Sequence, residues 1–337
     1  MSAAPPAGGD ALELEAELEE PPQGVQWAAT QRAYLRAIIE EQIPTFRARP
    51  YIHDQQHLLE LLAAGLATTL RDEFCWSLCF QPAFVRMLCH EGFLPICSEI
   101  ANGTGLYVLL PKLHTRRCVL EFGNVRVQKS TRKRARGFRM SVNRAFARVM
   151  EGCVEQHGED WLHPPMRAVL SRLHDWEQAR HGVAHDGKAA GVAPAGACGS
   201  AMASFELWDE AGQLVAGEVG CVSGRCYTSF TGFHRVANAG SVQLALTARL
   251  LERASFAFWD LGQEFEYKAQ LGAQLWPRAR FLERFHAVRG QPSALHDVSL
   301  DAQLLADPAQ LLGQAGEPAG SEGPPGQPSM HDEVDDD

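Results

Sequence analysis

The chain has 337 residues, of which 45% are hydrophobic, and a formal net charge of −10 at pH 7. This hydrophobic content excludes a wholly disordered chain, and the length allows one large domain or two small ones. No stretch approaches the roughly 18 apolar residues that a membrane span requires. The N-terminus has neither the apolar segment of a secretory signal nor the arginines of a transit peptide, so we expect a cytoplasmic protein.

The negative charge is concentrated at the two ends of the sequence. Residues 1–26 carry six carboxylates and residues 291–337 carry ten, with no Lys or Arg in either stretch, whereas 27–290 has a net charge of +6. Both ends are also rich in Ala, Pro and Gly, so we expect acidic disordered tails at 1–26 and 291–337. The charge of the whole chain argues against nucleic acid as a partner, but the charge of the body does not.

The first part of the body, residues 27–128, is expected to form a small mixed α/β N-terminal domain. Its hydrophobic spacing predicts helices at 27–42, 53–70 and 81–91 and strands at 93–97, 106–110 and 117–121. The third helix is favoured by Pro82, which suits the first turn of a helix.

The second part, residues 129–290, has a clearer order of elements. We expect a strand at 138–142, helices that begin after Asn143 and at Pro164, a loop at 179–201, strands at 202–208, 214–222 and 225–230, a helix at 238–254, a strand at 256–261, and helices at 265–272 and 277–288. Ser223-Gly224 would make the tight turn of a hairpin. Three consecutive antiparallel strands, then a helix and a returning strand, indicate an α+β fold rather than a Rossmann sheet.

Several short motifs, taken in their order along the chain, resemble those of the leucyl/phenylalanyl-tRNA–protein transferase family. The similar positions include 140–146, 149–153, Trp161, Asn238-Ala239 and 271–273, and the resemblance extends over roughly 80–286. It implies a GNAT-like acyltransferase domain with a mixed sheet. It also implies the activity, which is transfer of Leu or Phe from aminoacyl-tRNA to the N-terminal α-amine of a protein, giving an N-degron. The partners would be aminoacyl-tRNA and an acceptor protein, no cofactor would be needed, and a monomer would suffice.

Two features suit an RNA partner. The indole of Trp161 is a stacking platform, and the resemblance implies contact with the 3′-terminal adenosine; a core Trp is the alternative. Six cations lie within eleven residues with no carboxylate between them: Lys129, Arg132, Lys133, Arg134, Arg136 and Arg139. This density is typical of a groove that tracks phosphates, although a solvated connector or a targeting signal has the same composition.

The candidate catalytic residues depart from the family's pattern. The family has Asp-x-Gln, whereas here two residues separate Asp260 from Gln263, so the Gln is shifted by one position. Gln263 can act as the catalytic Gln only if the strand ends or bulges at Gly262. Phe230 stands where the family has a Glu that helps to hold the attacking amine. Hairpin arithmetic places Glu218 beside Ser229, next to that position. We hypothesise that Glu218 supplies the relocated carboxylate or reads a different aminoacyl side chain; an exposed Glu on an edge strand is the alternative.

Phe230, Phe233 and Asn238 are the remaining candidates for substrate binding. Asn238 lies three residues after Arg235, at a position where GNAT enzymes have a Gly that helps to cradle a pyrophosphate. Asn at this position disfavours acyl-CoA as a ligand. The alternative is that Asn238 only caps the following helix. Two alternative functions therefore stay open: another GNAT or Fem-type acyltransferase with a different donor or acceptor, or a tRNA-binding homologue that has lost the chemistry.

The nine cysteines give no indication of a metal site. They are scattered and lack the short paired spacing of structural zinc ligands. We expect reduced, buried thiols and no bound metal.

Overall fold

The computed structural model describes residues 29–100, 103–159, 161–183, 199–293, 295 and 308–313. The expected tail at 1–26, and most of that at 291–337, lie outside these residues. None of the described helices is long and apolar enough to cross a membrane.

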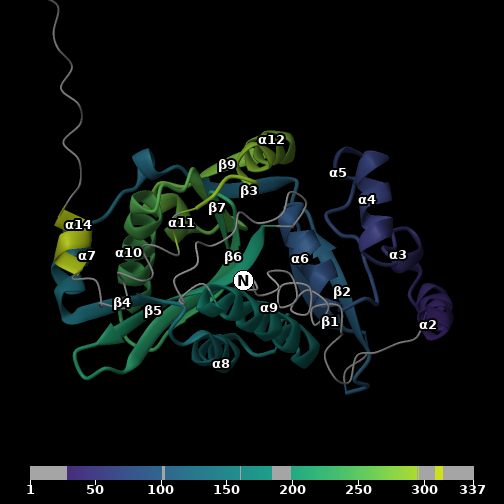
Figure 1. Ribbon diagram of the computed structural model, residues 1–337, viewed down its shortest axis with the longest axis horizontal. Helices are drawn as coiled ribbons and strands as arrows, with labels where there is room; N and C mark the ends of the chain where they lie inside the picture. Colours follow the sequence, from purple (N-terminus) through teal and green to yellow (C-terminus); the bar gives the residue numbers. More distant parts are fainter. Residues whose placement is uncertain are drawn as a thin grey trace, which may run out of the picture.

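A mixed seven-stranded sheet forms the centre of the fold, with the strand order β4-β5-β6-β7-β8-β3-β9 (Figure 1). The strands are β3 (Arg116–Leu120), β4 (Phe138–Val142), β5 (Ser200–Asp209), β6 (Leu214–Ser223), β7 (Cys226–His234), β8 (Phe258–Gly262) and β9 (Gln274–Pro277). Only the β7–β8 pair is parallel, because α10 (Ala239–Arg253) crosses between these two strands.

Helices cover both faces of this sheet, each over its own apolar core. One face is packed by α6 (Pro82–His90), α8 (Phe146–His157), α9 (Pro164–Val183) and α12 (Arg278–Val288). The other is packed by α10, α11 (Glu266–Leu271) and α14 (Pro308–Gly313). The helix α7 (Lys129–Arg134) contacts α10 and α14 on this second side.

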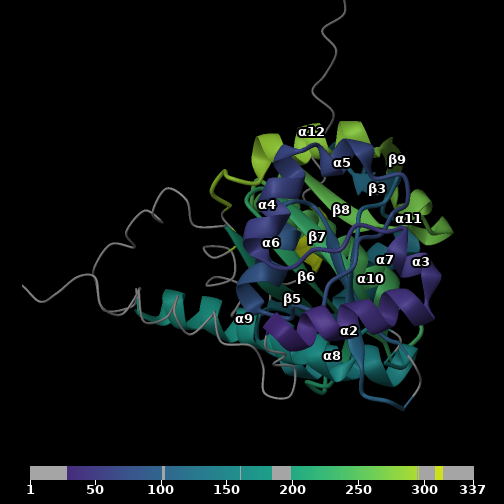
Figure 2. The same ribbon diagram turned by 90° about the vertical axis from the view of Figure 1, so that its right-hand side faces the viewer.

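The N-terminal elements lie at the opposite end of the molecule from α7 and α14 (Figure 1), and Figure 2 looks onto them. They are α2 (Ala29–Gln42), α3 (Pro44–Arg47), α4 (Gln55–Ala63), α5 (Leu66–Thr69) and an antiparallel pair of strands, β1 (Leu94–Glu99) and β2 (Tyr107–Lys112). The single helix expected at 53–70 is two helices, because Gly65 between them adopts a φ of +89°.

The element order expected from β4 to α12 is confirmed apart from the short edge strand β9. The α+β class, the mixed sheet and the mixed N-terminal part are confirmed as well. The place of β3 differs from our expectation that an N-terminal domain runs to residue 128, because β3 lies inside the large sheet between β8 and β9. Hydrophobic periodicity predicts a strand but not its long-range partner.

Two smaller differences concern local structure. Asn143, expected to cap α8, instead adopts a φ of +57°, and its Oδ1 accepts a hydrogen bond of 2.9 Å from the Ser204 amide. Within the stretch expected to be a disordered tail, Leu311 and Leu312 of α14 are buried in the core under α10. The leucines give this part of the acidic segment an apolar face that its overall composition conceals.

Candidate active site

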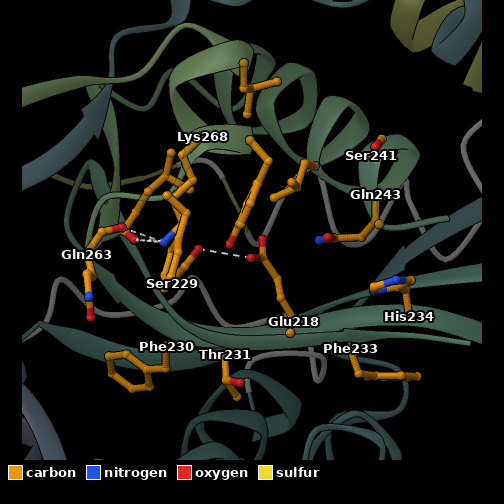
Figure 3. A pocket seen from close by; sticks show the side chains of 18 of the residues that line it. Glu218, Ser229, Phe230, Thr231, Phe233, His234, Ser241, Gln243, Gln263 and Lys268 are labelled. Carbon is orange, nitrogen blue, oxygen red and sulfur yellow. Dashed lines mark hydrogen bonds between the residues drawn. The ribbon is translucent and has the colours of Figure 1, made fainter. Parts of the chain in front are cut away.

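A cavity of about 890 Å³ lies where β6, β7, β8, α10 and α11 meet (Figure 3). Six of the residues singled out from the sequence line it: Trp161, Glu218, Phe230, Phe233, Asn238 and Gln263. Asp260 and the six cations of 129–139 do not line it. The fold therefore brings together residues that are more than 100 positions apart in the sequence.

Glu218 is the buried acidic group of this cavity, with only 4% of its surface exposed. Its Oε2 accepts a hydrogen bond of 3.0 Å from the Ser229 hydroxyl, which itself accepts one of 2.7 Å from the Trp259 indole N–H. The other oxygen, Oε1, has no hydrogen-bond partner among the described residues. Burial raises the pKa of Glu218 to about 7, against the opposing effects of Ser229, Gln243 and Lys268. Such a group changes charge near neutral pH and is suited to proton transfer.

The hairpin that carries Glu218 has a different register from the one expected. Ser223 pairs with Cys226, so the turn residues are Gly224 and Arg225 rather than Ser223-Gly224, and the pairing is shifted by two residues. Because side chains alternate with a period of two, this shift leaves each of them on its expected face. The strand β6 is also an interior strand, so the alternative of an exposed Glu218 on an edge is wrong.

A β-bulge near the cavity sets the contact between Glu218 and Ser229. The register shifts between Val219 and Gly220, and Phe230 is the unpaired extra residue of β7. Ser229 pairs with Gly220, which makes Ser229 and Glu218 diagonal neighbours on one face instead of direct partners. The same bulge turns Phe230 into the cavity.

Aromatic side chains form part of the cavity wall. Trp161 is half-buried and meets Phe230 edge to face, with ring centroids 6.2 Å apart, so it is not a fully buried core Trp. Phe233 is buried against Gly152, where a Cβ would lie 2.7 Å from the Phe233 ring. The guanidinium of Arg235 lies 4.8 Å from the centroid of the same ring. Trp161 and Phe230 thus keep more accessible ring surface than Phe233.

Asp260 lies outside the cavity, although we assigned it a catalytic role. It is fully buried, its Oδ1 lies 3.3 Å from Arg117 Nε, and its Oδ2 accepts a hydrogen bond of 3.0 Å from the Thr228 hydroxyl. Successive strand residues face opposite sides of a sheet, so Asp260 points away from the side where Leu261 joins the α10 core. Asp260 can act on the cavity only through the residues that it positions.

The backbone after Asp260 brings Gln263 to the cavity. Asp260 Oδ1 accepts a hydrogen bond of 2.9 Å from the Gly262 amide, and Gly262 ends β8 with a φ of +71°. The condition that we set for Gln263, that the strand ends before it, is therefore met. The side chain of Gln263 is exposed. It follows Gly262, whose left-handed backbone conformation favours glycine at that position.

Lys268 is a further buried group that was not among the site residues expected from the sequence. Its Nζ donates hydrogen bonds to the carbonyl oxygens of Leu261, at 2.6 Å, and Gln263, at 2.8 Å. Burial lowers its pKa, with Cys118, Asp260 and Glu218 opposing. Lysine is rarely buried, so the sequence gave no indication that Lys268 would be. Lys268 fixes the loop that presents Gln263.

The start of α10 does not provide a pyrophosphate cradle of the usual form. Asn238 adopts a φ of +68° at the N-cap position and makes no side-chain capping bond, which is against the plain-cap alternative. Arg235 is occupied, because it forms an ion pair with Glu155 and donates a hydrogen bond of 3.0 Å to the Leu214 carbonyl. These contacts agree with the sequence argument against acyl-CoA.

The basic segment is a solvent-facing strip beside the cavity. All six cations of 129–139 are exposed, and none of them forms an ion pair with a carboxylate of the described residues. Thr131 on the buried side of α7 lines the cavity, as does Arg126 just before this helix. The strip therefore leads to the cavity rim.

The described residues contain no group of His, Cys, Asp and Glu side chains arranged to hold a metal ion. Eight cysteines fall in this part of the chain, and all are buried. Burial raises the pKa of several of them, for example that of Cys75 to about 12. These thiols are packing residues.

The order of elements from β4 to α11 is that of a GNAT-like acyltransferase domain. The family model for leucyl/phenylalanyl-tRNA protein transferase matches residues 119–286. Proteins named leucyl/phenylalanyl-tRNA--protein transferase are similar to this chain: that of Azoarcus sp. (strain BH72) is 34% identical over 53% of this chain and 68% of its own length, and that of Nitratidesulfovibrio vulgaris (strain DP4) is 31% identical over 53% and 69%. The chain belongs to the leucyl/phenylalanyl-tRNA–protein transferase family.

Two further comparisons add detail. The relative from Thiobacillus denitrificans (strain ATCC 25259 / T1) is 34% identical over 50% of this chain and 65% of its own length. A solved domain from Agrobacterium fabrum matches with a TM-score of 0.31 and 10% identity over 52% of this chain and 65% of that chain, which is too low a similarity to inform the fold.

Proposed function

We propose that this protein transfers an apolar amino acid of the Leu or Phe type from aminoacyl-tRNA to the N-terminal α-amine of an acceptor protein, and that the product enters an N-degron pathway. The observation that carries the proposal is Glu218, a buried carboxylate with one unpartnered oxygen, in a cavity that also holds Trp161 and Gln263. We further propose that it acts as a monomer in the cytoplasm, and that the basic body is the working part of the chain.

The chemistry is aminolysis of an ester. The α-amine nitrogen forms a bond to the aminoacyl carbonyl carbon, the bond from that carbon to the ribose oxygen breaks, and one proton moves from the nitrogen to the ribose oxygen. The ester is already activated, so the enzyme has to position two reactants and carry this proton. With a pKa of about 7, Glu218 can accept the proton from the amine and return it to the leaving oxygen.

Other residues would position the donor. In this proposal Trp161 stacks on the terminal adenosine, and the exposed cations of 129–139 contact the phosphates. Apolar lining residues of the cavity, among them Leu94, Leu244 and Leu261, would receive the aminoacyl side chain. The Gln263 side chain would donate to the developing oxyanion from the loop that Lys268 fixes.

A second candidate is a tRNA-binding homologue without transfer activity. It is favoured by Phe230 and Gly262, which stand where the family has the Glu and the Gln. If the protein does transfer an amino acid, Glu218 of β6 and Gln263, just after β8, must replace these two side chains. The assay below decides between the two candidates.

Incubation with leucyl- or phenylalanyl-tRNA that carries a radiolabelled amino acid, together with a peptide whose first residue is Arg or Lys, is expected to label the peptide. An otherwise identical peptide with an acetylated N-terminus should stay unlabelled, because it offers no α-amine. Tight tRNA binding without labelling would instead show the second candidate, and saturable binding of acetyl-CoA would indicate a different GNAT-type donor.

Reversing one charge in the basic strip should weaken tRNA binding. Lys133→Glu is expected to lower affinity for uncharged tRNA and to reduce the salt dependence of binding by roughly one unit of slope, as for one lost phosphate contact. Arg253→Glu is the matched control, because Arg253 is an exposed cation at the far end of α10. Filter binding from low to physiological salt measures both. Equal losses in the two variants would mean that net charge, rather than this strip, attracts the RNA.

A further inference from the structure

Two exposed aromatic rings lie together at the rim of the cavity. Phe265 is 47% exposed and Tyr267 is 50% exposed. Their planes are within 9° of parallel, with centroids 5.8 Å apart. Among the described residues the large exposed apolar side chains are few: Tyr34, Leu59, Val236, Phe265 and Tyr267. Single exposed apolar residues are common on protein surfaces, whereas two that lie side by side indicate a binding site.

The pair belongs to the wall of the same cavity as Glu218. Phe265 and Tyr267 both line it, at the start of α11. The ammonium of Lys268 lies 4.7 Å from the Phe265 centroid and 5.7 Å from that of Tyr267, and its two hydrogen bonds to backbone carbonyls hold it there. The rings are therefore tied to a fixed loop and positioned before any ligand arrives.

The segment that leads into the basic strip lies against the helix that carries this pair. The Arg126 amide donates a hydrogen bond of 2.8 Å to the carbonyl of Leu271, the last residue of α11, so the chain entering α7 touches the helix that carries the rings. Arg126 and Gln128 line the same cavity as Phe265 and Tyr267. Segment 126–128 therefore connects the basic strip to the part of the cavity wall that holds the rings.

We propose that Phe265 and Tyr267 form a stacking platform for a base in the unpaired 3′ end of the tRNA, separate from the base that meets Trp161. This inference rests on the proposed function. A single strand with phosphates on one side and bases on the other matches a row of exposed cations followed by exposed rings. Trp161 precedes α9 and the pair begins α11, so the two platforms come from different walls of the cavity and do not compete for one base.

The charges at the rim favour RNA over the acceptor peptide as the occupant. The proposed acceptor carries a positive N-terminus, which Arg126 and the strip on α7 would repel, whereas phosphates are attracted to them. The platform therefore belongs to the donor side of the reaction, and the acceptor enters elsewhere along the cavity.

Progressive shortening of the tRNA tests the proposal. The probes are the full-length uncharged transcript and transcripts that lack one, two or three 3′ nucleotides, and affinity is measured at fixed salt. The variant Phe265→Leu/Tyr267→Leu, which keeps apolar bulk but removes the rings, should bind the full-length transcript roughly 5- to 100-fold more weakly, as expected for one lost base–aromatic stack. The loss should disappear once the stacked nucleotide is removed from the RNA.

Matched variants make the result specific. Tyr267→Phe keeps the ring and should bind like the wild type, and so should Tyr34→Leu, which removes an exposed ring of α2 that does not line the cavity. Thermal unfolding of the double variant should match the wild type, because both side chains are half exposed. The proposal is overturned if the double variant binds every transcript like the wild type, or if only its half-saturating concentration of acceptor peptide rises. A wild-type protein that neither binds tRNA nor transfers an amino acid would overturn the proposed function as well.

Discussion

Replacing Glu218 with glutamine is expected to slow amino-acid transfer by at least about 100-fold, the usual loss when a proton-transfer group is removed. The glutamine keeps an oxygen to accept the Ser229 hydrogen bond, but it cannot take a proton from the attacking amine. The wild-type rate should rise with pH through about 7, because burial raises the pKa of Glu218 to about 7 and only the charged form accepts a proton. Single-turnover transfer across pH 5.5–9 measures both effects. The variant should lose the step near pH 7 and keep only the rise that follows deprotonation of the acceptor α-amine, at about pH 8.

The same substitution is expected to stabilise the folded protein at high pH. The pKa of Glu218 is raised on folding from 4.5 to about 7, so its contribution to stability is complete below pH 4.5 and is lost as the pH rises through about 7. At about 1.4 kcal/mol per pKa unit, the charged form costs about 3 kcal/mol above pH 8, and glutamine removes that cost. Slower transfer together with a higher free energy of unfolding at pH 8.5 would mark Glu218 as a functional group kept at the expense of stability.

Glu206 provides the matched control for this experiment. It is another fully buried carboxylate whose pKa burial raises, but it accepts hydrogen bonds from Ser141, Ser204 and the Ala145 amide and does not line the cavity. Glu206→Gln should therefore leave the transfer rate of the folded fraction within a few-fold of the wild type. If Glu218→Gln behaved in the same way, Glu218 would not carry the proton.

Breaking the Arg117–Asp260 pair is expected to have the largest effect on stability. Asp260→Asn leaves the guanidinium of Arg117, itself 1% exposed, without its anionic partner, and such a change costs roughly 3–5 kcal/mol. Chemical denaturation at pH 7.5 measures the loss. The double variant Arg117→Met/Asp260→Leu should recover most of it, since apolar side chains can replace a buried ion pair.

The double variant also separates the two roles that Asp260 can have. Its carboxylate accepts from the Gly262 amide and so orients the turn that presents Gln263. If Asp260 is a positioning residue, transfer by the stable double variant should have a reduced kcat with little change in the KM for aminoacyl-tRNA, and Gln263→Ala should show the same pattern. Full activity of the double variant would leave Asp260 with a structural role alone.

Local patterns identified most of the elements and six of the residues that line the cavity. The alternation at 138–142, the helical spacing at 238–254 and the buried run at 256–261 each reflect burial of one face, which depends on near neighbours in the sequence. Trp161, Phe233 and Asn238 were likewise found because short motifs keep their order and spacing, whereas Phe230 and Gln263 were found as departures from those motifs.

The sequence by itself thus determined the order of elements, the family and the location of the positive charge. Only the tertiary structure decided that β3 joins the large sheet, that Asp260 is turned away from the cavity, and that Glu218 is buried with an unpartnered oxygen. It also decided that Lys268 is buried and that Phe265 and Tyr267 stand at the rim. The reason is physical: these properties depend on contacts between residues from 5 to about 140 positions apart and on what lies above each face of the sheet. Composition and periodicity record only which side chains prefer to be buried.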